Sequence, residues 1–313
     1  MAETWVLVFP GQGAQAVGMG KDVAEALPEA RELFARADKL LGVPLTETIF
    51  EGPEAALLDT ANQQPALVLM GLVMKKAVES KLGRPLSCAA AAGLSLGEYA
   101  ALSAVGVLTF DSAIRLVRQR GELMQEAARK TPCGMAVIMN LGEEQVRAAC
   151  AQAARETGAI VSPSNYNGGG QIVIGGTTEA LARACELCKA AGAKRVMKLP
   201  VAGAFHTALM QPAADAFAAD LDAADFSPAS APVYANVSAA PVRAPAEIRD
   251  ALKKQLTSSV LWEQTVKNLV AAGHTRFLEL GPGSTLSSMI RRIAPQAECK
   301  AISTWADVNG LTI

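Results

Sequence analysis

The sequence lacks any imbalance of charge that would mark a protein built to bind a polyanion. Its 313 residues carry 29 basic and 30 acidic side chains, which gives a formal net charge of −1. This balance argues against nucleic-acid binding, and a polyanionic partner would have to meet a local basic patch. Charged residues make up only 19% of the chain and hydrophobic residues 50%, which excludes a disordered protein. The length predicts one large domain with a smaller one.

A signal peptide and a membrane span are also missing. The N-terminal segment MAETWVLVFPGQG has no basic start and no long apolar stretch, so residues 5–9 predict a first core strand. The most apolar segment, residues 88–108, is nearly long enough to span a membrane, but Gly93, Gly97 and Glu98 interrupt it. A buried strand, a tight turn and a buried helix explain it better. We therefore expect a cytoplasmic protein with no membrane association.

Patterns typical of metal sites are missing as well. Of six cysteines, only Cys185 and Cys188 are closely spaced, and neither a second such pair nor a histidine lies near them in the sequence. The apolar periodicity around them favours two packed helix residues over a metal or redox site. We expect no metal, and a reducing intracellular compartment fits these cysteines best.

What is present is a regular alternation of strands and helices. Predicted strands are 5–9, 88–92, 233–236 and 276–280, and predicted helices are 22–41, 65–82, 97–105, 111–130, 208–223, 246–256, 263–272 and 284–293. Such alternation predicts a mainly parallel sheet with helices on both faces, and hence the α/β class.

The middle of the chain has a different rhythm. Strands at 135–141, 159–164, 171–174 and 194–199 and helices at 143–156 and 178–191 give the order βαββαβ. That order is typical of a ferredoxin-like unit. We therefore predict a small domain at 134–199, inserted into a large domain made of 1–133 and 200–313. The glycines at 168–170 fall between two of these strands and favour a hairpin turn over a phosphate-binding loop.

The most specific chemical signal is a GxSxG motif, Gly93 to Gly97, between a predicted strand and a predicted helix. A sharp strand-to-helix turn leaves room only for glycine two positions before and two positions after the serine. It lifts the hydroxyl of Ser95 toward a helix N-terminus. This context favours a nucleophilic serine. A glycine-lined turn with an incidental serine is the alternative.

A serine nucleophile needs a base, and the chain has only two histidines. His274 lies beside a glycine at a helix-to-strand turn, which indicates a surface residue. His206 lies in a loop that opens a helix, where folds of this class assemble catalytic groups. We expect His206 to be the base, although a structural histidine at a helix start would also explain it.

A second glycine-flanked turn follows the first strand, at Gly11-Gln12-Gly13. Its backbone amides would suit an oxyanion hole formed by Gln12 N–H and Leu96 N–H. An ordinary tight turn would also explain these glycines. A phosphate loop is not indicated, because no GxGxxG or Walker pattern completes the motif.

Several segments occur in an order that resembles the malonyl-CoA:acyl carrier protein transacylase family. They run from Phe9 to Arg292 and include FPGQGAQAVGMG, QQPA, GLSLGEYAAL, RQRGELMQEA, NYNGGGQIVIGG, AFHTALM, QLTSSVLW and LELGPGSTL. The resemblance implies an α/β-hydrolase-like large domain with a ferredoxin-like small domain. It implies malonyl transfer from malonyl-CoA, through a malonyl-serine ester, to an acyl carrier protein, with no cofactor.

The same resemblance assigns roles to individual residues. It implies Ser95 as nucleophile, His206 as base, and Gln12 and Leu96 as oxyanion donors. Gln255 is implied to supply an oxygen that orients the histidine. One residue departs from the family motif, because Leu94 stands where a histidine is usual. This puts the fine positioning of the turn in question.

Substrate selection is implied to depend on three further residues. Arg120 would hold the malonyl carboxylate through two parallel hydrogen bonds, Gln63 would line the pocket, and Phe205 would favour malonyl over methylmalonyl. Without the resemblance, Arg120 could equally be an exposed helix residue. Five basic residues could form a docking patch for an acidic carrier protein, or could be ordinary solvated charges. They are Arg115, Arg118, Lys194, Arg195 and Lys198.

Three other functions stay open at this point. A free-standing acyltransferase of a polyketide or polyunsaturated lipid synthase would share these motifs. A serine hydrolase of acyl thioesters would have no use for Arg120. A non-enzymatic carrier-protein-binding scaffold would not require Ser95 or His206.

Overall fold

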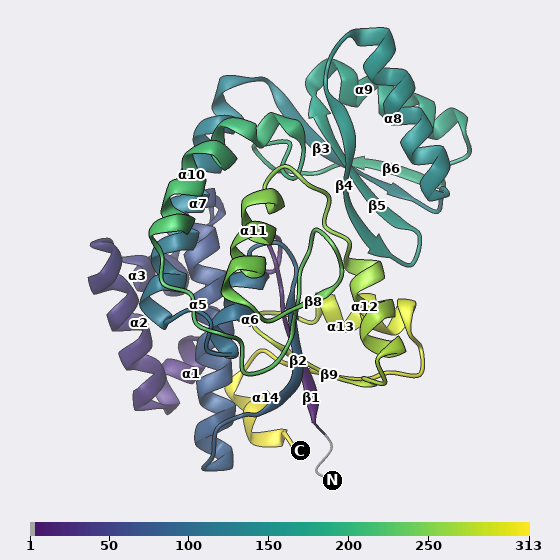
Figure 1. Ribbon diagram of the computed structural model, residues 1–313. Coiled ribbons are helices and arrows are strands. Elements are labelled where there is room, and N and C mark those ends of the chain that lie inside the picture. The colour runs from purple at the N-terminus through teal and green to yellow at the C-terminus, as the bar shows by residue number, and fades with distance from the viewer. Residues whose placement is uncertain (1–3) are drawn as a thin grey trace.

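The computed structural model describes residues 4–313 and contains two separate sheets (Figure 1). The larger has six strands in the order β10-β9-β1-β2-β7-β8. All neighbouring strands are parallel except β7 and β8. The strands are β1 (Trp5–Phe9), β2 (Cys88–Gly93), β7 (Val233–Tyr234), β8 (Pro241–Val242), β9 (Arg276–Leu280) and β10 (Glu298–Ile302).

Helices cover both faces of this sheet. Residues of β1 alternate between two apolar clusters, because successive strand side chains point to opposite faces. Leu7 and Phe9 pack with one group of helices, and Val6 and Val8 with another that includes α12 and α13. The helices are α1 (Lys21–Ala26), α2 (Pro28–Leu41), α3 (Leu45–Glu51), α4 (Glu54–Leu58), α5 (Thr60–Leu82), α6 (Gly97–Ala104), α7 (Phe110–Lys130), α10 (Gln211–Ala223), α11 (Pro245–Gln255), α12 (Trp262–Ala271), α13 (Thr285–Ile293) and α14 (Trp305–Gly310), and a 3₁₀ turn (Ala208–Met210) precedes α10.

The smaller sheet lies at one end of the molecule with two helices packed on it (Figure 1). It has four antiparallel strands in the order β4-β5-β3-β6. Its elements are β3 (Cys133–Met139), α8 (Glu143–Thr157), β4 (Val161–Gly168), β5 (Gln171–Thr177), α9 (Thr178–Ala190) and β6 (Arg195–Lys198). This is the predicted βαββαβ order, so the fold class is confirmed. The domain boundaries at 134 and 199 stay a prediction.

A short ladder joins the small sheet to the segment that follows α11. Tyr166 N donates to Val260 O and Val260 N donates to Ser164 O, both at 2.9 Å. Ser259 Oγ donates to Pro163 O at 2.8 Å. The segment after α11 is therefore held by the small sheet on one side and by the large domain on the other.

Two predicted helices have different bounds in the structure. The helix expected at 22–41 is broken at Leu27, whose backbone is extended because the residue before a proline avoids the helical region. The helix expected at 65–82 begins instead at Thr60, capped by the side chain of Asp59, so Pro65 lies inside it. The prediction that Pro65 marks the first turn is wrong.

Within residues 4–313, no helix is both long and apolar enough to cross a membrane. The prediction that the N-terminus is not a signal peptide falls partly on residues 1–3, which lie outside the described residues. Cys185 and Cys188 are buried in α9, in the core of the small sheet.

Candidate active site

Ser95 lies at a sharp turn between β2 and α6, with a φ of 56°. A Cβ on Gly93 would come within 2.0 Å of the backbone of Gly97, and one on Gly97 within 2.2 Å of Phe9 O. Neither glycine can therefore carry a side chain. The GxSxG motif has glycine at these two positions because the backbone at Gly93 contacts Gly97, and the backbone at Gly97 contacts β1.

Asn236, which follows β7, holds this turn from the neighbouring strand. Its Oδ1 accepts from Ser95 N at 2.6 Å, and its Nδ2 donates to Gly93 O at 2.7 Å. The sequence reasoning missed Asn236, and its only signal was a polar residue at the end of a predicted strand. The backbone amide of Ser95 is therefore already engaged, which leaves the next amide, that of Leu96, for other use.

His206 meets Ser95 from a separate loop, before the 3₁₀ turn. Its Nε2 lies 2.7 Å from Ser95 Oγ, and its Nδ1 lies 2.8 Å from the backbone oxygen of Gln255. A carbonyl oxygen can only accept, so Nδ1 carries the proton and Nε2 is free to accept from the serine. His206 also has a positive φ, 59°, and such strained backbone gathers at functional sites.

Electrostatics keep this histidine neutral. Burial lowers the pKa of His206 to about 4, and the positive charge of Arg120 acts in the same direction. The hydrogen bond to Gln255 O opposes the shift without overcoming it. At neutral pH the imidazole can therefore take a proton from Ser95.

Arg120 reaches the serine from α7 and is fully buried. Its Nη2 donates to Ser95 Oγ at 3.1 Å and to Gln255 Oε1 at 3.0 Å. Its Nη1 donates to Gln64 Oε1 at 2.6 Å, and among the described residues its Nε has no partner. A buried guanidinium with no directly bonded carboxylate, beside a serine hydroxyl, is suited to an anionic ligand.

Glu98 is a second buried charge that the sequence reasoning noted only as an interruption of an apolar run. Its Oε2 accepts from Gln255 Nε2 at 2.7 Å and from Asn236 N at 3.2 Å. Burial raises the pKa of Glu98 to about 7, against the opposing effects of these two bonds and of Arg120. Gln255 Nε2 also donates to Ser95 O at 3.0 Å. Glu98 therefore bonds two residues, Gln255 and Asn236, that themselves hold the turn at Ser95.

The glycine turn after β1 lies directly against this turn. A Cβ on Gly11 would come within 2.4 Å of Leu94 O and 2.8 Å of Leu94 Cδ2. Among residues 4–313, neither Gln12 N–H nor Leu96 N–H donates a hydrogen bond. Leu94, which stands where a histidine was expected, is partly buried and packs on the apolar cluster that includes residues of α12 and α13.

The remaining predicted residues lie at different places around this site. Gln63 is buried in α5, and in the described chain its Oε1 has no partner. Phe205 is buried against Gly203, next to His206. It is Gln64, which the sequence reasoning did not single out, that contacts Arg120. His274 is half-buried at the turn between α12 and β9.

A cavity of about 290 Å³ lies between the small sheet and the segment after α11. His206 contributes to its lining, together with Arg147, Tyr166 and Thr257. Across residues 4–313, no three His, Cys, Asp or Glu side chains gather in a way that could hold a metal.

A serine bonded to a neutral histidine at a strand-to-helix turn defines a class of protein that transfers acyl groups through a serine ester. The acyl transferase domain family matches residues 6–307, and the chain belongs to that family. It is an acyltransferase.

Named relatives are similar over nearly the full length. The malonyl CoA-acyl carrier protein transacylase of Bacillus subtilis strain 168 is 41% identical, over 95% of this chain and 92% of its own. That of Escherichia coli K12 is 40% identical, over 96% of each chain.

Solved structures agree. The acyl carrier protein S-malonyltransferase of Vibrio cholerae superposes with a TM-score of 0.93 at 41% identity, covering 99% of this chain and 100% of that one. A malonyl-transacylase in complex with a type II PKS acyl-carrier protein gives a TM-score of 0.94 at 40% identity, with 98% of each chain covered.

Proposed function

We propose that this protein transfers a malonyl group from malonyl-CoA to the phosphopantetheine thiol of an acyl carrier protein, supplying fatty acid synthesis. One observation carries the proposal: the hydroxyl of Ser95 lies between a neutral His206 and the buried cation of Arg120. The first arrangement suits acyl transfer, and the second suits an acyl group with its own carboxylate.

In the proposed first half-reaction, Ser95 Oγ attacks the thioester carbonyl and His206 Nε2 takes the hydroxyl proton. The oxyanion is stabilised by Gln12 N–H and Leu96 N–H, which have no other acceptor within residues 4–313. The carbon–sulfur bond then breaks, His206 returns the proton to the CoA sulfur, and a malonyl-serine ester remains. Gln255 orients His206 through its backbone oxygen.

The second half-reaction reverses these steps with another thiol. His206 takes the proton of the carrier-protein thiol, and the thiolate attacks the ester carbonyl. The carbon–oxygen bond to Ser95 then breaks, and His206 returns the proton to Ser95 Oγ. Because one thioester replaces another, the exchange is nearly thermoneutral. The proposed steps use only this chain's residues, with malonyl-CoA as substrate and no cofactor or metal.

Selection of malonyl rests on Arg120. A malonyl carboxylate would bond the buried guanidinium directly, whereas an acetyl group would leave it with neutral hydrogen-bond partners only. Gln63 is proposed to line this acyl pocket, and the buried ring of Phe205, beside His206, to exclude a methyl branch.

The proposed partners are malonyl-CoA and an acyl carrier protein, with no nucleic acid and no membrane, in the cytoplasm. The relatives' names support the first two, and one relative is solved with a carrier protein. Residues 134–199 are proposed as the small domain and 1–133 with 200–313 as the large one. A polyketide carrier is the alternative acceptor, since that solved partner is of this kind.

The test is intact-protein mass spectrometry after brief mixing with malonyl-CoA or acetyl-CoA. Wild type should gain a malonyl-sized adduct that passes to added carrier protein, and Ser95→Ala should gain none. Rapid release of free acid, with no preference for malonyl over acetyl, would instead identify a hydrolase.

A further inference from the structure

Pro65 leaves a gap in the backbone hydrogen bonding of α5. In an α-helix the amide of each residue donates to the carbonyl oxygen four residues earlier, so the usual donor to Ala61 O is the amide of residue 65. Proline has no N–H, and Pro65 is buried inside the helix. The oxygen of Ala61 therefore needs a donor from elsewhere.

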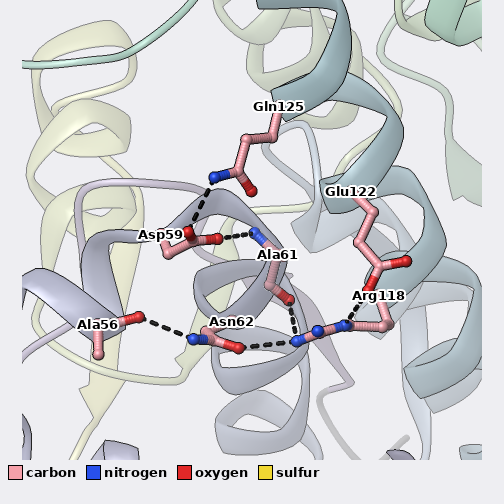
Figure 2. A network of polar contacts seen from close by, with 7 residues as sticks. All are labelled: Ala56, Asp59, Ala61, Asn62, Arg118, Glu122 and Gln125. Carbon is pink, nitrogen blue, oxygen red and sulfur yellow. Dashed lines mark hydrogen bonds and ion pairs between the residues drawn. The ribbon is translucent and has the colours of Figure 1, made fainter. Parts of the chain in front are cut away.

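Arg118, on the adjacent helix α7, supplies that donor (Figure 2). Its Nη1 donates to Ala61 O at 3.2 Å and to Asn62 Oδ1 at 2.7 Å. Its Nε donates to Glu122 Oε1 at 2.6 Å. From the sequence, Arg118 could belong to a docking patch or be an ordinary solvated charge. In the structure its side chain is only 24% exposed, and its guanidinium is held by three acceptors.

Further bonds complete this connection between α4, α5 and α7. Asp59 accepts from Ala61 N at 3.0 Å and from Gln125 Nε2 at 2.8 Å. Asn62 Nδ2 donates to Ala56 O at 2.9 Å. Figure 2 shows Arg118 and Gln125 of α7 directed at the first turn of α5. We call these seven residues the α5–α7 clamp: Ala56, Asp59, Ala61, Asn62, Arg118, Glu122 and Gln125.

The clamp adjoins the residues that meet at Ser95. Gln64 directly precedes Pro65, and Arg120 follows Arg118 by two positions. Arg120 Nη1 donates to Gln64 Oε1 at 2.6 Å. Between the two helices, Gly121 lies so close to α5 that a Cβ there would be 2.5 Å from Thr60 O. Such a bare backbone contact sets how near the helices lie. The polar clamp adds directional contacts between the same two segments.

We propose that Arg118 is a positioning residue for acyl selectivity. By bonding the carbonyl oxygen that Pro65 leaves without a donor, it fixes the register of α5 against α7 and so holds Gln64 and Arg120 in place. The proposal rests on the proposed function, because Arg120 is the residue that would recognise malonyl. A small displacement of Arg120 removes the two-point contact with a carboxylate beside Ser95. It disturbs the attack of Ser95 on an uncharged acyl group less, because there the guanidinium contributes only its bond to Ser95 Oγ.

The test compares malonyl and acetyl loading of Ser95 in wild type, Arg118→Ala and Arg118→Lys by rapid-quench mass spectrometry. We expect the malonyl-to-acetyl ratio of loading efficiency to fall about five- to ten-fold in Arg118→Ala, as loss of a charged hydrogen-bond donor predicts. Lysine offers one compact ammonium in place of the fork and should restore the ratio only in part. Arg129→Ala, an exposed change on the same helix, is the control and should leave the ratio unchanged.

A second arm tests the route through Ala61. Pro65→Ala restores the amide that can donate to Ala61 O. Arg118→Ala should therefore lower the malonyl-to-acetyl loading ratio less in the Pro65→Ala background than in wild type. Equal losses of malonyl and acetyl loading, or the same cost in both backgrounds, would overturn the proposal. A wild type that forms no malonyl ester would refute the function itself, and the role of Arg118 with it. If wild type loads malonyl and Arg118→Ala keeps the same selectivity, only the role of Arg118 is refuted.

Discussion

Replacing Glu98 with glutamine should stabilise the protein at alkaline pH. Glutamine keeps the shape of the side chain and an oxygen that can accept from Gln255 and Asn236, and it removes only the charge. In the folded protein the pKa of Glu98 is raised from 4.5 to about 7, mainly by burial. The folded state therefore binds more protons than the unfolded state between these values, so this group's contribution to stability falls as pH rises through them.

The size of the effect follows from the shift in pKa. Each unit is worth about 1.4 kcal/mol, so ionising Glu98 costs the folded state about 3 kcal/mol by pH 8. His206 behaves in the opposite sense, because its pKa is lowered from 6.5 to about 4. Its contribution is present above pH 6.5 and is lost as pH falls. In wild type the two slopes oppose each other between pH 4.5 and 6.5.

The assay is urea unfolding of wild type and Glu98→Gln at intervals from pH 4.5 to 8. The two proteins should have similar free energies of unfolding at pH 4.5, and the variant should be more stable by about 3 kcal/mol at pH 8. Glu144→Gln removes an exposed carboxylate and is the matched control. A constant difference across the range, or a variant less stable at pH 8, would show that the carboxylate is stabilised by its neighbours more than burial costs it.

Other predictions concern catalysis and folding. Because the pKa of His206 is about 4, kcat/KM for malonyl loading should stay level from pH 7 to about 5 and fall below that, as a pH–rate profile would show; a midpoint near 6.5 would contradict it. Arg120→Gln should lower kcat/KM for malonyl-CoA roughly 100-fold, as loss of two charge-assisted bonds implies, and lower kcat/KM for acetyl-CoA much less, through its bond to Ser95 Oγ alone; equal losses would refute carboxylate recognition. Gly93→Ala should yield no folded protein by circular dichroism, since its Cβ would lie 2.0 Å from Gly97, whereas Gly134→Ala, whose Cβ would lie 3.6 Å from its nearest neighbour, should fold. Charge reversal of Lys194, Arg195 and Lys198 together should raise the KM for the carrier protein without changing malonyl loading, and an unchanged KM would remove the docking patch.

Sequence reasoning works best here where one residue type has few alternatives. Only two histidines were available, and only one stood at a strand-end loop, so the meeting of Ser95 and His206 could be expected. The glycines of GxSxG predicted the strand-to-helix turn, because the steric need for glycine there is local in sequence. The βαββαβ order of the small sheet was equally accessible, since each of its elements has a clear period.

Contacts between distant segments could not be read in the same way. Asn236 and Glu98 lie 138 positions apart, and no local pattern pairs an amide with a carboxylate at that distance. Gln63 and Gln64 both lie at the start of α5, and only the rotation of the helix decides that Gln64 meets Arg120. The strand β10 was missed because it is an edge strand with only Ile302 fully buried, so it has no alternation of apolar residues.

The ladder at Val260 has a consequence for protein engineering. Gln255, whose carbonyl oxygen faces His206, is five positions from Val260, which bonds to the backbone of Ser164 and Tyr166. One short run of chain thus serves both as the support of the histidine and as the attachment point of the smaller sheet. A chimera that exchanges this sheet for that of another transferase must therefore transplant residues 255–261 as well, or His206 will lose the geometry that makes it a base.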